Sequence, residues 1–200
     1  MTGPAASGIV LAGGRSSRFG RDKLAEPIEG RPLLHRAIAA VAGVCTETLV
    51  VVTPVEAPPP LPAGLAVHVV RDPEPFGGPL VGLFAGLEQA REPLALVVAG
   101  DMPDLQPGVL RALVHALDDE DVAGAVLRYR GRDQPLPMAV RNGIAATRAR
   151  DLLARGERSL AALVSAVRAR ALEESDWRGV DPTAATLHDI DRPSDLDRYR

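Results

Sequence analysis

The chain has 200 residues, of which 46% are hydrophobic, 24% charged and 3% aromatic, with a formal net charge of −3. These values predict one globular domain over residues 1–200, with a core of aliphatic side chains. The acidic balance argues against a nucleic-acid partner, and no stretch approaches the roughly 20 apolar residues of a membrane span.

The chain order of the predicted elements begins with a short apolar run at residues 7–12, read as a buried strand. A helical pattern follows at 32–44, and a proline-rich stretch at 54–64 excludes both helix and central strand. In this half of the chain we expect strands at 7–12, 48–52, 66–70 and 94–99, and helices at 32–44, 80–90 and 107–117.

The second half continues with strands at 124–129, 136–140 and 186–190, helices at 142–155 and 159–168, and a last helix from Pro193. Short apolar strands separated by helices indicate a mostly parallel sheet covered on both faces, a three-layer α/β/α architecture. Ligands of such sheets bind beyond the carboxyl ends of the strands, so the residues at those ends are the first candidates for function.

The loop after the first strand carries the strongest signal. Gly13 and Gly14 allow close approach of the backbone to a ligand, and four cations follow within nine residues: Arg15, Arg18, Arg21 and Lys23. This clustering favours a triphosphate site over a solvated basic turn. Neither GxGxxG nor GxxxxGK[ST] is present, so the loop is neither a Rossmann fingerprint nor a Walker loop.

Acidic residues mark two further sites. Asp101 follows the strand at 94–99, where a carboxylate either holds Mg²⁺ or caps a turn. Asp189 and Asp191 flank Ile190 at strand spacing, which would point both carboxylates to one side and towards a cation. The alternative for Asp191 is to cap the helix that begins near Pro193.

Two other strand-end positions have less specific signals. Asp72 follows the strand at 66–70 and either accepts a hydrogen bond from a nucleobase or ribose or starts the turn at Pro73. Gly77, Gly78 and Pro79 open a helix, whose N-terminus favours an anion or close contact with a ligand. The histidines suggest no catalytic triad.

The run from Leu11 to Lys23, LAGGRSSRFGRDK, resembles the signature of the MobA-like nucleotidyltransferases. The likeness extends over nearly the whole chain. It includes Gly30–Leu33, Asp72, Gly78–Leu80, Gly100–Pro103, Gln134–Pro137 and Asp189–Pro193.

The resemblance implies a Rossmann-like nucleotide-diphospho-sugar-transferase fold and transfer of a nucleoside monophosphate to a phosphorylated acceptor, with release of pyrophosphate. The Ala-Gly-Gly form of the loop is similar to the GTP-using branch, which implies GTP and molybdopterin as substrates and Mg²⁺ as cofactor. Also implied are a cytoplasmic enzyme and transient contact with proteins that handle the molybdenum cofactor; no oligomeric state is assigned.

The resemblance also assigns roles to residues. Backbone groups of Leu11, Ala12 and Gly13 would contact the base, and Lys23 a phosphate or the base end. Asp101 would bind magnesium, with Asp189 and Asp191 as further metal candidates. The catalytic set is Arg15, Lys23 and Asp101, and the nucleotide-binding set is Leu11, Ala12, Gly13, Gly14, Arg18, Lys23, Thr53, Asp72, Gly78 and Asp101.

Two departures from the family pattern leave alternatives open. Thr53 stands where the guanylyltransferases often carry Asn, and Asp189 and Asp191 replace an Asn-x-Asn pair. The second departure is compatible with a second metal or a different acceptor. CTP with molybdopterin, GTP with a phospholactate-type acceptor, a sugar 1-phosphate, and a nucleotide-binding protein without catalysis therefore remain alternatives.

Overall fold

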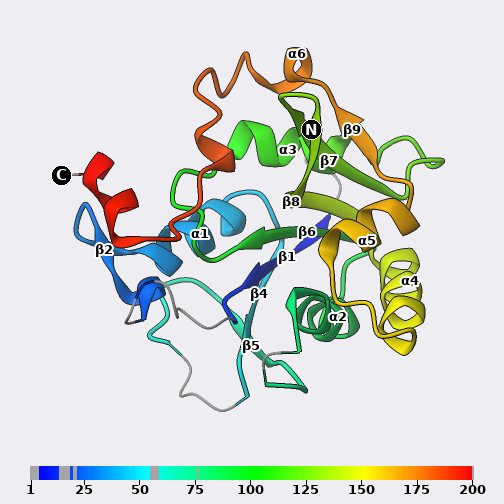
Figure 1. The fold of residues 1–200 in the computed structure, drawn as a ribbon, viewed down its shortest axis with the longest axis horizontal. Helices are drawn as coiled ribbons and strands as arrows, with labels where there is room; N and C mark the ends of the chain where they lie inside the picture. The colour runs from blue at the N-terminus through cyan, green and yellow to red at the C-terminus, as the bar shows by residue number, and fades with distance from the viewer. Residues whose placement is uncertain (1–4, 14–18, 20–21, 55–58, 76, 200) are drawn as a thin grey trace.

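The computed structural model describes residues 5–13, 19, 22–54, 59–75 and 77–199. Within these ranges a central sheet has the strand order β5-β4-β1-β6-β8-β7-β9 (Figure 1). Its strands are β1 (Ala6–Leu11), β4 (Glu47–Val52), β5 (His68–Arg71), β6 (Leu94–Ala99), β7 (Gly124–Tyr129), β8 (Arg132–Arg141) and β9 (Arg170–Leu172).

The sheet is mostly parallel, as predicted. β1 pairs in parallel with β4 and β6, β4 with β5, and β7 with β9, whereas β8 runs antiparallel to both β6 and β7. The chain moves outward from β1 to β4 and β5, then crosses to β6 on the other side of β1. This reversal makes the carboxyl ends of β1 and β6 the switch point where ligands bind in such sheets.

Helices cover both faces of the sheet (Figure 1). One face packs against α1 (Leu33–Ala42), α3 (Pro107–His115) and Trp177 of α6 (Glu174–Trp177). The other packs against α2 (Pro79–Gln89), α4 (Asn142–Ala154) and α5 (Leu160–Ala166).

Alternation along β1 explains the two cores. Val10 lies in the cluster of the first face and Ile9 in that of the second, and both are fully buried. Successive strand side chains point to opposite faces, so a run of apolar residues supplies both cores at once. The predicted three-layer architecture is confirmed.

A third, smaller apolar cluster joins the two ends of the chain. It contains Phe19, Ile28, Leu33, Ile190 and Leu196. Ile28 belongs to the hairpin of β2 (Pro27–Ile28) and β3 (Arg31–Pro32), and Leu196 to the 3-10 helix η3 (Pro193–Tyr199). Figure 1 accordingly shows the red C-terminal segment beside β2. This cluster brings the last residues of the chain to the switch point.

The strand predicted at 186–190 is wrong. Residues Ala185–Leu187 form the 3-10 helix η2, and His188–Ile190 have no regular structure. The buried carboxylate of Asp181 accepts hydrogen bonds from the amides of Ala185 and Thr186, each 2.9 Å long. Because a side chain satisfies these amides, they are not available to a strand ladder.

Other boundaries differ more mildly. β8 begins at Arg132 rather than 136, because the turn at Arg130 and Gly131, both with positive φ, closes a hairpin with β7. The short elements β2, β3, β9, α6 and the 3-10 helix η1 (Lys23–Ala25) were not predicted, and the last helix is 3-10 rather than α. In the described ranges, no helix is both long and apolar enough to cross a bilayer.

Candidate active site

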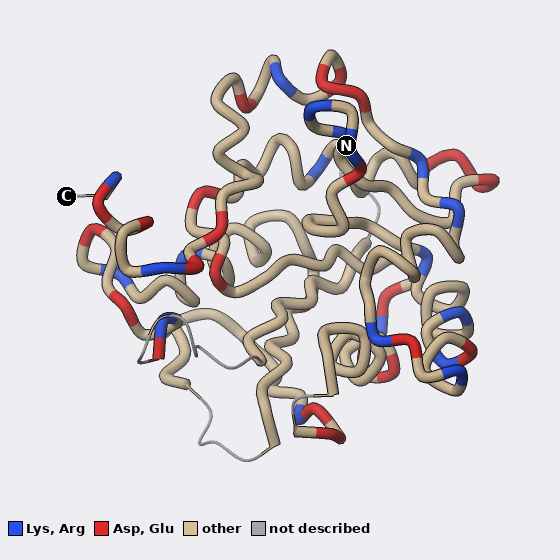
Figure 2. Tube along the Cα trace, viewed as in Figure 1, with Lys and Arg blue, Asp and Glu red and all other residues tan. Residues whose placement is uncertain are grey.

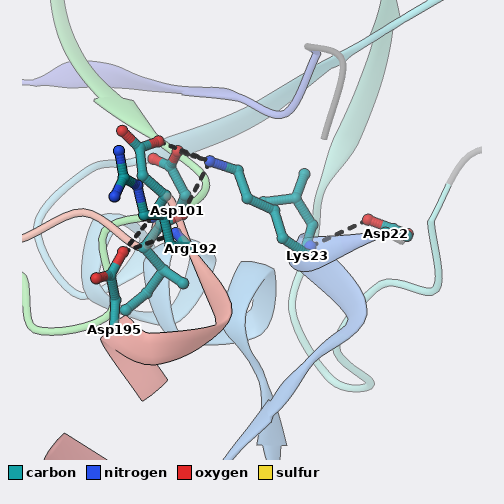
Figure 3. A network of polar contacts seen from close by, with 8 residues as sticks. Asp22, Lys23, Asp101, Arg192 and Asp195 are labelled. Atoms are coloured by element: carbon teal, nitrogen blue, oxygen red, sulfur yellow. Dashed lines mark hydrogen bonds and ion pairs between the residues drawn. The ribbon is translucent and has the colours of Figure 1, made fainter. Parts of the chain in front are cut away.

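Lys23 lies at the centre of a polar network beyond the carboxyl ends of β1 and β6 (Figure 3). Its ammonium Nζ donates to Asp101 Oδ2 at 2.6 Å, to the Ile190 carbonyl at 2.9 Å and to Asp191 Oδ1 at 3.4 Å. A lysine ammonium has three donors, and here each has an acceptor. The structure thus brings Lys23 and Asp101, two of the predicted site residues, into direct contact, while their roles towards phosphate and magnesium stay predictions.

The cap of η1 and the glycine at the end of β6 bring Lys23 and Asp101 together. Asp22 caps η1 by accepting a hydrogen bond from the Leu24 amide at 3.0 Å. On the side of Asp101, the amide of Gly100 donates to the Leu11 carbonyl at 2.9 Å. A Cβ on Gly100 would lie 3.0 Å from Leu34 Cδ1 and 3.3 Å from the Leu11 oxygen. Glycine therefore allows the end of β6 to approach β1 closely, which brings Asp101 within reach of Lys23.

The C-terminal segment supplies the remaining partners. The Ile190 amide donates to the Asp101 carbonyl at 3.0 Å, while the Ile190 carbonyl accepts from Lys23. Asp191 bonds to Lys23 directly, whereas Asp189 interacts with Lys23, Asp101 and Asp191 through its charge. Partial burial, followed by the charges of Asp191 and Asp101, raises the pKa of Asp189. The strand alternation expected for Asp189 and Asp191 is absent, so their proximity to Asp101 comes from packing of the tail.

Lys23 is the single lysine of the chain, whose other basic side chains are arginines and four histidines. Its side chain is only 17% exposed. Burial opposes the charged form, but the hydrogen bond and charge of Asp101, then those of Asp191, outweigh it and raise the pKa of Lys23. The site therefore holds a permanent, compact positive charge rather than a neutral amine.

The acidic groups fit a hard divalent cation in part. The Asp101 side chain is 19% exposed and that of Asp191 is 50% exposed, and carboxylate oxygens are ligands that Mg²⁺ accepts. However, the part of the chain that the structure describes contains no group of three or more His, Cys, Asp or Glu side chains arranged to hold a metal. Mg²⁺ is commonly held by one or two carboxylates together with substrate phosphates, and this donor set fits that arrangement.

The residues whose backbone was predicted to contact the base lie on the β1–β4 side of the site, and their contact with a base stays a prediction. The Leu11 carbonyl is bonded to Gly100, and the Ala12 amide donates to the Val51 carbonyl at 2.8 Å. Gly13 is exposed, and a Cβ there would lie 3.7 Å from the Thr53 amide. Leu11, Ala12, Gly13 and Thr53 are thus brought together at the ends of two adjacent strands.

Thr53 carries an unsatisfied hydroxyl at this position. The residue is 8% exposed, and its Oγ1 has no hydrogen-bond partner among the described residues. Its carbonyl accepts from the Arg71 guanidinium at 3.2 Å. A buried hydroxyl without a partner is costly, and Asn142 Oδ1 and Trp177 Nε1 are in the same state elsewhere in the fold. The position of Thr53 at a strand end beside Gly13 makes it a candidate ligand contact.

Asp72 lies one strand further out, at the end of β5. Its Oδ1 accepts from the Glu74 amide at 3.0 Å and so forms the turn, while its predicted contact with the nucleoside stays a prediction. Its Oδ2 lies against α2, 3.3 Å from where a Cβ on Gly82 would be. Burial raises the pKa of Asp72; the Glu74 amide opposes that rise, and the Glu74 charge adds to it.

Gly78 has a structural reason for being glycine. Its φ is +97°, and a Cβ would lie 2.9 Å from Arg158 Cβ. The Arg158 carbonyl also accepts from the Leu80 amide in the first turn of α2, at 3.2 Å. The close approach expected at this helix start is therefore made by the segment before α5.

Gly14, Arg15 and Arg18 lie outside the described residues, as does Arg21. Their predicted roles stay predictions. Sequence reasoning also missed the Ile190 carbonyl, because any residue type can present a backbone carbonyl. The isolation of Lys23 among arginines was a usable signal, since a site that needs a compact ammonium does not accept Arg.

Comparison with known proteins places the chain in a family. Residues 8–173 match the MobA-like NTP transferase domain. A protein of Chloroflexus aggregans named as a probable molybdenum cofactor guanylyltransferase is 38% identical over 95% of this chain and 91% of its own length. A Mycobacterium bovis protein of the same name is 35% identical over 91% of each chain.

Solved structures agree at the level of the fold. The molybdopterin-guanine dinucleotide biosynthesis protein A of Archaeoglobus fulgidus superposes with a TM-score of 0.78 at 19% identity, covering 96% of each chain. The 2-C-methyl-D-erythritol 4-phosphate cytidylyltransferase of Thermus thermophilus gives 0.69 at 20% identity, covering 96% of this chain and 95% of the other. These neighbours have the nucleotide-diphospho-sugar-transferase fold that the resemblance implied. The chain belongs to the MobA-like NTP transferase family and is a nucleotidyltransferase.

Proposed function

We propose that the protein transfers GMP from GTP to the terminal phosphate of molybdopterin and releases pyrophosphate. The observation that carries this proposal is the Lys23–Asp101 pair at the switch point of a MobA-like sheet, 2.6 Å apart and largely shielded from water. Relatives at 35–38% identity that bear the guanylyltransferase name support the choice of substrates.

In this reaction an oxygen of the acceptor phosphate attacks the α-phosphorus of GTP. The new P–O bond forms as the bond to the bridging α,β-oxygen breaks, and pyrophosphate leaves with that electron pair. The acceptor phosphate is already ionised near neutral pH, so the protein need not supply a general base. Its task is positioning and charge neutralisation.

The residues divide this task. Lys23 offers a fixed positive charge to phosphate oxygens, and Arg15 and Arg18 are proposed to add bidentate contacts to the triphosphate. Thr53, Asp72 and the backbone of residues 11–13 are proposed to bind the nucleoside. Asp101, with Asp191 and Asp189 beside it, would hold Mg²⁺, which when bound supplies electrostatic stabilisation of the phosphate oxygens.

The test is pyrophosphate release with Mg²⁺ and molybdopterin, with GTP, CTP, ATP and UTP supplied separately. GTP-dependent release supports the proposal. Preference for CTP would replace the guanylyl donor by a cytidylyl donor, an outcome that Thr53 in place of the usual Asn makes worth testing. If GTP binds but molybdopterin is not modified, the acceptor in the proposal is wrong, and phospholactate and sugar 1-phosphates are the next to assay.

A further inference from the structure

The C-terminal segment Asp189–Tyr199, here termed the C-terminal clasp, lies against the site and holds two of the three acceptors of Lys23. We propose that Asp195, in the turn of this clasp, is a positioning residue that fixes the Lys23 ammonium through Ile190 and Asp191. The role in catalysis rests on the function proposed above; the placement of Lys23 does not.

Asp195 organises the backbone that faces Lys23. Its Oδ2 accepts from the Asp191 amide at 2.9 Å and from the Arg192 amide at 2.7 Å, and its own amide donates to the Arg192 carbonyl at 3.0 Å (Figure 3). These three bonds close the turn directly after Ile190. The direction of the Ile190 carbonyl and the position of the Asp191 side chain therefore depend on a carboxylate that does not touch Lys23 itself.

The clasp is anchored on both sides of this turn. Ile190 is fully buried and Leu196 is 8% exposed, both in the apolar cluster with Ile28 and Leu33. Further along, the Tyr199 hydroxyl donates to Asp104 Oδ2, and Asp104 Oδ1 accepts from Arg36 at 3.2 Å. Asp104 lies three residues after Asp101. The clasp is thus tied to the same loop that presents Asp101 to Lys23.

This arrangement matters because an ammonium on a flexible four-carbon stem has little intrinsic directionality. Lysine is a strongly hydrated point charge with rotatable donors, so its position must be set by its acceptors. Asp101 alone would leave two donors of Lys23 for water. The Ile190 carbonyl and Asp191 take those donors, and Asp195 keeps both acceptors in place.

The experiment measures how protected Lys23 is, and the sequence makes it simple. Because Lys23 is the single lysine, an amine-acetylating N-hydroxysuccinimide ester labels only Lys23 and the α-amino group at the start of the chain, which serves as the internal reference. Labelling rates at fixed pH, read by peptide mass spectrometry, are compared for wild type, Asp195→Ala, Asp195→Asn and Ser194→Ala. Neither nucleotide nor acceptor is present, so failure of the proposed function does not affect this result.

We expect Asp195→Ala to raise the labelling rate of Lys23 by about 3- to 10-fold, the equivalent of loosening one hydrogen bond. Asp195→Asn should restore most of the protection, since its amide oxygen still accepts from both amides although the charge is gone. Ser194→Ala, a change at an exposed neighbour, should match wild type. In turnover assays Asp195→Ala should raise the KM for the nucleotide more than it lowers kcat.

An Asp195→Ala protein that is folded, by circular dichroism, but labels Lys23 at the wild-type rate would overturn the proposal and leave Asp195 as a turn cap only. If that variant does not fold, Tyr199→Phe decides instead. It removes only the hydroxyl that ties the clasp to Asp104, and should raise Lys23 labelling in the same direction by a smaller factor. Unchanged labelling in Tyr199→Phe would then refute the proposal.

Discussion

The polar groups at the two ends of the central strand β1 have different kinds of partner. At the amino end, the Ser7 hydroxyl donates to Glu47 Oε2 at 2.6 Å, the Arg91 amide donates to the same oxygen at 3.0 Å, and the Glu92 amide donates to Ser7 at 3.1 Å. Each of these groups satisfies another part of the fold. The network joins β1, β4 and the loop before β6, so it holds these parts of the fold together.

At the carboxyl end, the polar groups surround the charged Lys23 ammonium, and the unsatisfied Thr53 hydroxyl lies at the end of the neighbouring strand. Lys23 is surrounded by acceptors from the loop after β6 and from the clasp, and Thr53 keeps a buried Oγ1 without a partner among the described residues. Figure 2 shows that charged residues gather at strand ends and on outer helices, while the middle of the sheet carries none. The polar groups in the amino-end network bond to one another, whereas those at the carboxyl end surround the Lys23 ammonium.

Asp101→Asn should have the largest effect. It keeps the side-chain shape but removes the charge that faces Lys23 and is proposed to hold Mg²⁺. Losing roughly 4 kcal/mol of electrostatic stabilisation corresponds to a turnover about 10³-fold lower, measured as pyrophosphate release. The matched control is Asp121→Asn, the same change at an exposed aspartate, which should keep wild-type turnover. Retained Mg²⁺-dependent activity in Asp101→Asn would remove it from the metal site.

Lys23→Gln should come next, lowering kcat/KM for GTP by about 10- to 100-fold, mainly through KM. This is the range expected when a favourable contact with a charged group, worth roughly 1.5–3 kcal/mol, is lost. Lys23→Arg separates charge from shape. It should recover only part of the loss, because a planar guanidinium does not fit the three acceptors of a compact ammonium. An unchanged dependence on GTP in both variants would contradict the assignment.

Thr53→Val should have a smaller effect, which differs between folding stability and GTP binding: stability is kept or increased, whereas GTP binding is weakened. Removing a buried hydroxyl that has no partner in the described part of the chain should leave the thermal midpoint unchanged or raise it. If the hydroxyl serves the nucleotide, the Kd for GTP should rise by about 3- to 10-fold, as expected for one neutral hydrogen bond. Calorimetric titration of GTP and thermal unfolding of the same sample check both halves. A lower thermal midpoint together with an unchanged Kd for GTP would make Thr53 a structural residue.

Glu47→Gln, at the amino end, should leave activity unchanged and cost about 1 kcal/mol of stability. Its side chain is only 9% exposed. Burial alone would raise the pKa of Glu47, but the Ser7 hydroxyl, the Arg91 amide and the Arg91 charge together lower it.

The pH dependence of the folding stability follows from this lowering of the Glu47 pKa. A carboxyl whose pKa is lower in the folded state contributes stability above its unfolded pKa, and this contribution is lost as the pH falls through the folded pKa. Urea unfolding from about pH 6 to pH 3 should therefore show a steeper loss of stability for wild type than for Glu47→Gln. Parallel curves would show that Glu47 contributes no charge-dependent stability, and an activity loss would break the contrast between the two ends.

Local sequence patterns were sufficient for most of the architecture. The apolar runs at residues 7–12, 48–52 and 94–99 are buried strands because each supplies both faces of a covered sheet. Their order with helices implied parallel pairing, and the position of Asp101 at a strand end followed from it. Parallel strands end at the same edge, which made both residues candidates, but the adjacency of β1 and β6 that joins them came from the tertiary structure.

Only the tertiary structure decided what completes the site. Asp101 is 78 residues from Lys23 in the sequence and Ile190 is 167 residues away, and a backbone carbonyl leaves no trace in residue type. The sequence at 186–190 has the composition of a strand, yet the buried carboxylate of Asp181 binds the amides of Ala185 and Thr186 at its start and holds them in a 3-10 turn. Such contacts depend on packing between distant segments. The sequence by itself therefore determined the sheet and the strand-end candidates, whereas packing of the C-terminal clasp decided how Lys23 is held.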